Sequence, residues 1–214
     1  MESFVLNNII PDFLETEKVI GSEIWNQDIL ISKGQKIQLI APSGSGKTSL
    51  VHFIYGLRKD YNGQILFDGN DVKSFSAEKL SGFRRSYMSI VFQDLRLFPE
   101  QTARQNIEVK RLLEPFASSE RMEYMTALLG IQSKLDQPAK LCSYGEQQRI
   151  AIVRALQQPF DLLVLDEPFS HLDESNREKA MLLIQEEVAA RNATMLLADL
   201  KPIEYFNADR ILHL

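Results

Sequence analysis

The sequence predicts an α/β fold with a mostly parallel β-sheet. Short apolar segments alternate with longer amphipathic ones along the chain. The apolar segments are bounded by turn residues or charges, as buried strands are. No internal repeat or low-complexity linker interrupts the 214 residues, and strands separated by helices favour a parallel sheet covered on both faces. The expected strands are 37–40, 89–92, 162–165 and 194–198, and the expected helices are 48–55, 120–129, 146–157 and 174–191.

Composition is that of a globular protein and weighs against some functional classes. The hydrophobic fraction is 44% and the charged fraction is 25%, both near the averages for soluble domains. The net charge of −5 argues against a dedicated nucleic-acid binder, which usually has a basic face. Cys142 is the single cysteine, so no intrachain disulfide forms and a reducing compartment is expected.

The N-terminal residues MESFVLNNIIPDFLETE lack the basic region and the apolar core of a signal peptide. No apolar stretch in the sequence approaches the roughly 20 residues that a spanning helix needs. If the protein works at a membrane, the sequence therefore predicts that another chain crosses it.

The strongest local pattern is the segment KIQLIAPSGSGKTSLV, in which an apolar strand leads into a glycine-containing loop and then a helix. This is the context that a phosphate-binding loop requires. Gly44 and Gly46 let the backbone curl so that successive N–H groups point at phosphate oxygens. Lys47 can reach the β- and γ-phosphates, and the Thr48 hydroxyl can ligate Mg²⁺. The predicted nucleotide-binding residues here are Ala41, Pro42, Ser43, Gly44, Ser45, Gly46, Lys47, Thr48 and Ser49.

One position departs from the usual GxxxxGK[ST] pattern of such loops. Its first glycine is Ala41 in this chain. If the backbone there needs a positive φ, alanine is strained by about 1 kcal/mol.

An apolar strand followed by two acids, LLVLDE, supplies the second part of the predicted site. A strand that ends beside the phosphate loop places Asp166 near the Mg²⁺ and Glu167 near the water that attacks the γ-phosphate. Glu167 is then the candidate general base, and Lys47 is the other candidate catalytic residue. Two acids after a strand more often start a surface loop, but the phosphate loop favours the catalytic interpretation.

The segment LCSYGEQQRIAIVRAL resembles the LSGGQ-type signature of ABC ATPases and the helix that follows it. Ser143 followed three residues later by Glu146 is a capping-box pattern at a helix start. Gly145 keeps the first turn open, so that the helix presents free N–H groups to an anion. The serine and the second glycine match the family pattern, whereas a cysteine replaces its leucine and a tyrosine its first glycine.

The resemblance covers nearly the whole chain and implies the rest of the architecture. ABC ATPases have a RecA-like P-loop NTPase core, a small antiparallel β region near the N-terminus and an inserted α-helical subdomain. The resemblance implies a single domain, with its core at about 1–94 and 141–214 and the helical subdomain at about 95–140.

The resemblance also implies the bound groups and the partners. In this family ATP and Mg²⁺ lie between two cassettes packed head to tail, and each phosphate loop faces the signature of the other cassette. A second ATP-binding subunit, expected to be an identical copy, and a transmembrane permease are the implied partners, and no nucleic acid is expected. The implied location is cytoplasmic, at the inner face of the membrane through that permease. The signature and interface residues are Ser143, Gly145, Glu146 and Asp173.

Two further segments occur in the order expected for ABC ATPases, and the family also implies an aromatic side chain that stacks on adenine. VFQD resembles the Q-loop, which implies that Gln93 contacts Mg²⁺ or water and couples the site to the membrane partner. SHLD resembles the D-loop, where His171 is expected at the interface or in solvent rather than as a catalyst. Adenine usually stacks on an early aromatic side chain; Phe13 is the candidate and Trp25 the alternative, with a packing role open for both.

The family pattern breaks at the switch loop, where DLKP stands in place of the typical THDP. Leu200 occupies the position of the histidine that senses the γ-phosphate, and leucine has no hydrogen-bond donor. Losing one charge-stabilising contact costs about 3 kcal/mol of barrier, roughly a hundredfold in rate. Either hydrolysis proceeds on Glu167, Lys47 and Mg²⁺ at a reduced rate, or ATP acts mainly as a clamp that closes the dimer.

Two other functions are compatible with parts of the sequence. A soluble ABC-type ATPase that acts on nucleic acid or ribosomes usually carries long coiled coils or a second cassette, and neither is present here. A small-molecule P-loop kinase does not need the signature beside the acidic strand. The favoured hypothesis is the ATP-binding and ATP-hydrolysing subunit of an ABC transporter, which powers a separate transmembrane partner through dimer closure. The spacing around residues 92–99, together with residues 145–149, resembles the lipoprotein-release, macrolide-export and cell-division branch.

Overall fold

A five-stranded parallel sheet forms the centre of the chain in a computed structural model that describes all 214 residues. Its strands are β3 (Lys36–Ile40), β6 (Met88–Val91), β7 (Leu162–Asp166), β8 (Thr194–Asp199) and β9 (Arg210–His213). They lie in the order β6-β7-β8-β3-β9, and every neighbouring pair is parallel. Each of the four predicted strands matches one of these to within one residue at either end, which confirms the predicted parallel sheet.

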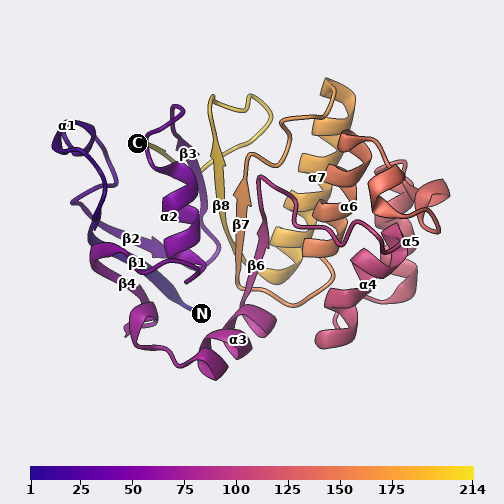
Figure 1. The fold of residues 1–214 in the computed structure, drawn as a ribbon, viewed down its shortest axis with the longest axis horizontal. Coiled ribbons are helices and arrows are strands. Elements are labelled where there is room, and N and C mark those ends of the chain that lie inside the picture. Colours follow the sequence, from indigo (N-terminus) through magenta and orange to yellow (C-terminus); the bar gives the residue numbers. More distant parts are fainter.

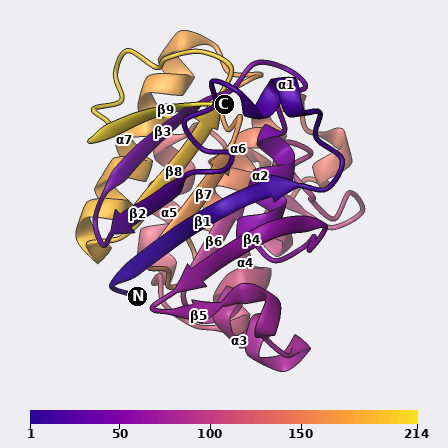
Figure 2. The ribbon, with the colours of Figure 1, turned by 90° about the vertical axis from the view of Figure 1, so that its left-hand side faces the viewer.

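An antiparallel sheet of four strands lies beside the parallel one and contains the N-terminal part of the chain (Figures 1 and 2). Its strands are β1 (Ser3–Pro11), β2 (Asp28–Ser32), β4 (Tyr61–Phe67) and β5 (Asn70–Asp71), in the order β2-β1-β4-β5. Exposed and buried side chains alternate along β2, because successive residues of a strand point to opposite faces. This sheet is the antiparallel region that the resemblance implied.

Seven helices complete the fold, and the prediction included four of them. They are α1 (Thr16–Val19), α2 (Lys47–Ile54), α3 (Ala77–Ser86), α4 (Ala103–Leu113), α5 (Ser119–Leu128), α6 (Tyr144–Ala155) and α7 (Glu174–Arg191), with short 3₁₀ turns η1 (Val72–Ser74), η2 (Gln132–Lys134) and η3 (Ala139–Leu141). The predicted helices correspond to α2, α5, α6 and α7. The start of α4 was also detectable, because Thr102 and Gln105 form a reciprocal capping box. None of the helices combines the length and apolar character that crossing a bilayer requires.

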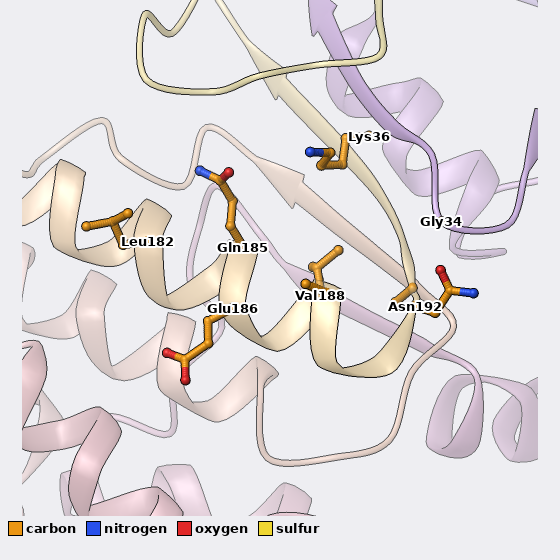
Figure 3. A pocket seen from close by; sticks show the side chains of 9 residues that line it. Gly34, Lys36, Leu182, Gln185, Glu186, Val188 and Asn192 are labelled. Carbon is orange, nitrogen blue, oxygen red and sulfur yellow. The ribbon is translucent and has the colours of Figure 1, made fainter.

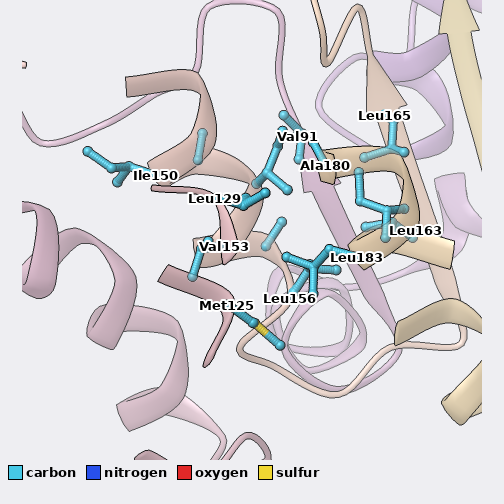
Figure 4. Close-up of a cluster of buried hydrophobic side chains, with 14 of the residues drawn as sticks. Val91, Met125, Leu129, Ile150, Val153, Leu156, Leu163, Leu165, Ala180 and Leu183 are labelled. Atoms are coloured by element: carbon cyan, nitrogen blue, oxygen red, sulfur yellow. The ribbon is translucent and has the colours of Figure 1, made fainter. Parts of the chain in front are cut away.

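The parallel sheet separates two hydrophobic cores, and β7 contributes side chains to both. Leu163 and Leu165 pack into the core shared with α6 and α7 (Figure 4). Leu162 and Val164 face the other core, which contains α2 and the antiparallel sheet. All four side chains are fully buried. Because both faces of β7 are covered, its carboxyl end is held rigidly at the edge where the predicted acids follow.

The region from about 95 to 140 contains α4, α5 and short turns, and no strand of either sheet. Both helices pack against α6, at one end of the molecule (Figure 1). Apolar residues of this region, among them Ile107 and Met125, belong to the same core as Leu163. The helical content is as predicted, and its division from the core as a subdomain at 95–140 stays a prediction.

Candidate functional site

The loop between β3 and α2 has the backbone shape that binding phosphate requires. Gly44 and Gly46 have φ angles of +79° and +96°, so the predicted need for glycine at both positions is confirmed. Gly46 is the N-cap of α2 and supplies no side chain that could cap the helix. The first N–H groups of α2 therefore lack helical partners and point out of the helix end, where an anion is favoured.

Trp25 lies directly beneath this loop. Its side chain is fully buried, and its indole Nε1–H donates a hydrogen bond to the Ser45 carbonyl oxygen at 3.1 Å. A Cβ added to Gly46 would lie 2.9 Å from the indole ring, so only glycine allows this close approach. The structure therefore assigns Trp25 to the support of the loop, and no face of its ring is available to a nucleotide base.

Phe13 lies at the rim of a cleft of about 310 Å³ beside the loop, with half of its side chain exposed. The guanidinium of Arg58 lies 4.7 Å from the centre of the Phe13 ring and donates a hydrogen bond to the Ser49 hydroxyl at 3.2 Å. The cleft brings together ten residues from both halves of the sequence: Phe13, Pro42, Ser43, Gly44, Gly46, Lys47, Thr48, Ser49, Gln93 and Glu167.

Two of the predicted nucleotide contacts, Ala41 and Ser45, do not line this cleft. Ala41 is fully buried and donates its N–H to the Asp199 carbonyl oxygen at 3.0 Å. Its φ is not positive, so the strain considered for alanine at this position does not arise. A position whose φ is not positive tolerates a methyl group, which explains why the first glycine of the usual pattern is dispensable here.

Asp166 ends β7 as a buried carboxylate that is 1% exposed. Burial raises its pKa to about 6, against the lowering effects of the Lys47 ammonium and the Thr48 hydroxyl. Its Oδ1 has no hydrogen-bond partner. A buried carboxylate oxygen without a partner is costly unless a cation or donor reaches it, so this residue fits a metal ligand.

The neighbours of Asp166 supply the other oxygens that Mg²⁺ prefers. The Thr48 hydroxyl donates to Gln93 Oε1 at 3.3 Å, and the three predicted metal ligands together line a hollow of about 350 Å³ next to the cleft. No cluster of three or more His, Cys, Asp or Glu side chains suited to a metal is present. That is compatible with Mg²⁺, which takes one or two carboxylates and completes its shell with water and phosphate oxygens.

Glu167 points its carboxylate at the Lys47 ammonium, and the two groups are in direct contact. Their side chains are only 13% and 6% exposed. The backbone of Glu167 is in the left-handed region, with φ +47°, and its N–H donates to the Ala198 carbonyl oxygen at 2.9 Å. The sequence placed these two residues in one site, and the structure brings their side chains together.

Asp199 is a third carboxylate at this edge, to which the sequence analysis assigned no role. It ends β8 beside Asp166 and Glu167 and lines a cleft of about 370 Å³ with Glu167 and Leu200. Burial raises its pKa above the usual 3.8, although the Leu200 N–H, 2.7 Å from Oδ1, lowers it. The available signal was its place at the carboxyl end of a buried strand, the same position that identified Asp166.

The signature segment forms the predicted helix start. The Glu146 N–H donates to Ser143 Oγ at 3.3 Å, and the Ser143 N–H donates to Glu146 Oε2 at 2.7 Å, which confirms the capping box. A Cβ at Gly145 would lie 3.0 Å from the His171 carbonyl oxygen. Glycine is therefore needed here because the loop after β7 passes close to α6, a reason that sequence reasoning did not supply.

Asp173 caps α7 within its own chain. Its Oδ1 accepts a hydrogen bond from the Asn176 N–H at 2.9 Å. Hydrogen bonds with Asn176 lower the pKa of Asp173. His171 packs its ring against Tyr144, with 4.1 Å between ring centres. Both Tyr144 and Asp173 are exposed, so this surface is available to a second chain.

A larger hollow of about 460 Å³ lies between α7 and the turn before β3 (Figure 3). Leu182 and Val188 line it from α7, and Gly34 from the turn. Its ionisable lining residues are Lys36 and Glu186, and it shares no residue with the cleft at the phosphate loop. It is therefore separate from the predicted nucleotide site.

The geometry agrees with the comparisons to known proteins. Residues 26–170 match the family described as ABC transporter. The chain belongs to that family. It is an ATP-binding cassette of the type found in the macrolide-export protein MacB and the lipoprotein-releasing protein LolD. Both belong to the branch that the sequence predicted.

Relatives within the ABC transporter family cover most of this chain. The lipoprotein-releasing system ATP-binding protein LolD of Syntrophotalea carbinolica is 32% identical over 191 residues, which cover 87% of this chain and 84% of LolD. The macrolide export ATP-binding/permease protein MacB of Nitrosomonas europaea is 33% identical over 173 residues, 79% of this chain and 26% of MacB. The chain thus spans about a quarter of the length of that relative.

Solved ABC cassettes share the fold. A bacterial ABC transporter cassette determined as a dimer has a TM-score of 0.82 and 25% sequence identity, and the match covers 99% of this chain and 94% of that one. The predicted α/β cassette is therefore confirmed, with its parallel core, antiparallel sheet and helices.

Proposed function

We propose that this ABC cassette binds Mg-ATP at the phosphate loop, hydrolyses it, and powers a separate transmembrane permease. One observation carries the proposal: Lys47, Asp166 and Glu167, from opposite halves of the sequence, meet at the carboxyl edge of one parallel sheet. Carboxyl ends of parallel strands are where α/β proteins place their ligand sites.

The binding step uses the loop and the rim of the cleft. The curled backbone at Gly44 and Gly46 and the N-terminus of α2 hold the phosphates, and Lys47 neutralises the β- and γ-phosphates. Phe13 offers its exposed ring to adenine. Ala41 and Ser45 anchor the loop, because the Ala41 N–H donates to the Asp199 carbonyl oxygen and the Ser45 carbonyl oxygen accepts from Trp25.

The chemical step uses the acids after β7. Glu167 accepts a proton from the attacking water as general base. Asp166, Thr48 and Gln93 hold Mg²⁺ through their oxygen atoms. The bound Mg²⁺ supplies Lewis-acid neutralisation of phosphate charge.

Two copies of the chain complete each site in this proposal. Ser143, Gly145 and Glu146 at the start of α6, with Asp173, face the nucleotide of the opposite copy. The dimeric cassette among the solved relatives supports this arrangement. The names of LolD and MacB support a permease partner, through which the cassette lies at the cytoplasmic face of the membrane.

The test is nucleotide binding and phosphate release by the purified chain and by Lys47→Ala. We expect the variant to lose at least roughly tenfold in Mg-ATP affinity and all measurable turnover, because a buried charge partner of the phosphates is removed. Lys179→Ala, at an exposed position of α7, is the matched control and keeps both. Unchanged affinity in Lys47→Ala overturns the proposal. A separate experiment, copurification of a membrane protein with this chain, identifies the permease.

A second candidate function is an ATP-dependent clamp that hydrolyses slowly or not at all. Leu200 supports it, because leucine stands at the switch position and is 44% exposed beside the Glu167 cleft. Steady-state phosphate release decides between the two. Release equal to that of a Glu167→Gln control favours the clamp, and release well above that control favours the transporter ATPase.

A further inference from the structure

Gln148 of α6 is a buried side chain whose three hydrogen bonds all go to the loop after β7. It is 1% exposed. Its Nε2 donates to the Glu167 carbonyl oxygen at 3.1 Å and to Ser170 Oγ at 3.3 Å, and its Oε1 accepts from the His171 N–H at 3.0 Å. The Gln148 amide therefore forms hydrogen bonds at both ends of the segment 167–171, which begins with the proposed general base.

The backbone of Glu167 needs this support. A non-glycine residue in the left-handed region is strained, and Glu167 has φ +47°. The Glu167 N–H is held by the Ala198 carbonyl oxygen, and the Glu167 carbonyl oxygen by Gln148. Both hydrogen bonds together set the direction in which the carboxylate leaves the chain.

Other residues in the first turn of α6 also contact the loop after β7. Gly145 allows the His171 carbonyl oxygen to approach, and the Tyr144 ring packs on the His171 ring. Ser143, the residue proposed to face the partner's nucleotide, caps this same helix five residues before Gln148. A shift of the helix start would therefore move the Glu167 backbone through the Gln148 amide.

We propose that Gln148 is a positioning residue that couples the signature helix to the Glu167 carboxylate and to the D-loop. This inference rests on the proposed ATPase function and extends it. When the partner's nucleotide engages Ser143, Gln148 transmits the position of α6 to the general base of its own chain. Gln148 does not itself line the cleft at the phosphate loop, so it makes no direct contact with a nucleotide bound there, and its effect on affinity is expected to be small.

Two substitutions separate the hydrogen bonds. Gln148→Met keeps the length of the side chain and removes every bond. Gln148→Glu keeps an acceptor for the His171 N–H but sets a carboxylate against the Glu167 carbonyl oxygen. Gln157→Met is the matched control, because Gln157 is also buried and its amide bonds to Val153 and Met125 instead.

Turnover at saturating ATP and the KM for ATP are measured for each variant, with amide hydrogen exchange over residues 167–171. We expect Gln148→Met and Gln148→Glu to lower kcat about tenfold to a hundredfold, with KM within about threefold of the parent chain. Exchange at His171 accelerates in Gln148→Met and stays slow in Gln148→Glu. Gln157→Met changes none of these.

The inference is overturned if both variants keep kcat within about twofold of the parent chain, or if loop exchange in Gln148→Met is unchanged. A fall in kcat shared by Gln157→Met also overturns it, because burial of a methionine would then be the cause. Absence of phosphate release in the parent chain contradicts the proposed function alone, and the exchange measurement still decides whether Gln148 orders the loop. Gln148→Glu serves if the methionine variant does not fold.

Discussion

The Lys47 ammonium and the Glu167 carboxylate are in direct contact, although 120 residues separate them in the chain. Lys47 begins α2 and Glu167 follows β7, so the contact joins the phosphate loop to the acidic strand end. Both side chains are largely buried, where the attraction between unlike charges is stronger than in water. A γ-phosphate that approaches Lys47 must compete with this carboxylate.

Glu167→Gln should therefore bind ATP more tightly while it loses turnover. We expect affinity to rise about threefold to tenfold, because a competing negative charge beside Lys47 is removed. Phosphate release should fall at least about a hundredfold, since an amide cannot accept the proton of water. Fluorescent-nucleotide titration and phosphate release measure the two effects. Glu178→Gln on the exposed face of α7 is the control, and weaker ATP binding by Glu167→Gln would contradict the prediction.

Asp199→Asn should stabilise the chain more at high pH than at low pH. Burial raises the pKa of Asp199 above 3.8, so the folded chain favours the protonated acid relative to the unfolded one. Stability from this group is fully present below about pH 4 and is lost as pH rises through the folded pKa. Asparagine cannot ionise, so we expect the Tm of the Asp199→Asn variant to exceed that of the parent chain by about 2–4 °C at pH 8. Equal Tm differences at pH 4 and pH 8 would exclude this ionisation as the cause.

Leu200→His should increase phosphate release if the missing switch histidine limits the rate. The Leu200 side chain is 44% exposed beside the cleft that contains Glu167, so histidine fits without opening a cavity. A donor to the γ-phosphate is worth about 3 kcal/mol in the transition state, which sets an upper limit of roughly a hundredfold on the gain. Leu200→Gln, which offers a donor of different shape, is the comparison. A histidine variant no faster than the parent chain means that another group already supplies this contact.

Phe13→Ala should weaken the binding of ATP but not of inorganic triphosphate. Half of the Phe13 side chain is exposed at the rim of the cleft, and stacking of a base on an aromatic ring is worth about 1–3 kcal/mol. We expect a loss of about fivefold to a hundredfold in ATP affinity, largely restored in Phe13→Tyr. Competition by tripolyphosphate serves as the internal control. Equal losses for both ligands would show that Phe13 acts on the phosphate loop rather than on the base.

Local patterns predicted most of the central sheet. The strands β3, β6, β7 and β8 and the helices α2, α5, α6 and α7 were predicted within two residues, because apolar runs and end signals occur within one segment of sequence. The strands of the antiparallel sheet were expected only through the family resemblance. Length is not the reason, since β1 has nine residues and β4 has seven. Instead, β1 is interrupted by a register shift between Asn7 and Ile10 that breaks the alternation of buried and exposed residues. The helices α3 and α4 were missed despite Ser76 and Thr102 at their starts, both of which cap by hydrogen bond.

The sequence by itself determined the phosphate loop, the acids after β7 and the capping box of the signature helix, because each depends on residues within one short stretch. Only the tertiary structure decided that Trp25 supports Gly46 from below, that Ala41 is unstrained, and that Asp199 joins the acidic edge. It also decided that Gln148 holds the Glu167 backbone. These relationships depend on which strands are neighbours in the sheet and on how closely the helices pack against them. Both are set by packing between segments that lie far apart in the chain.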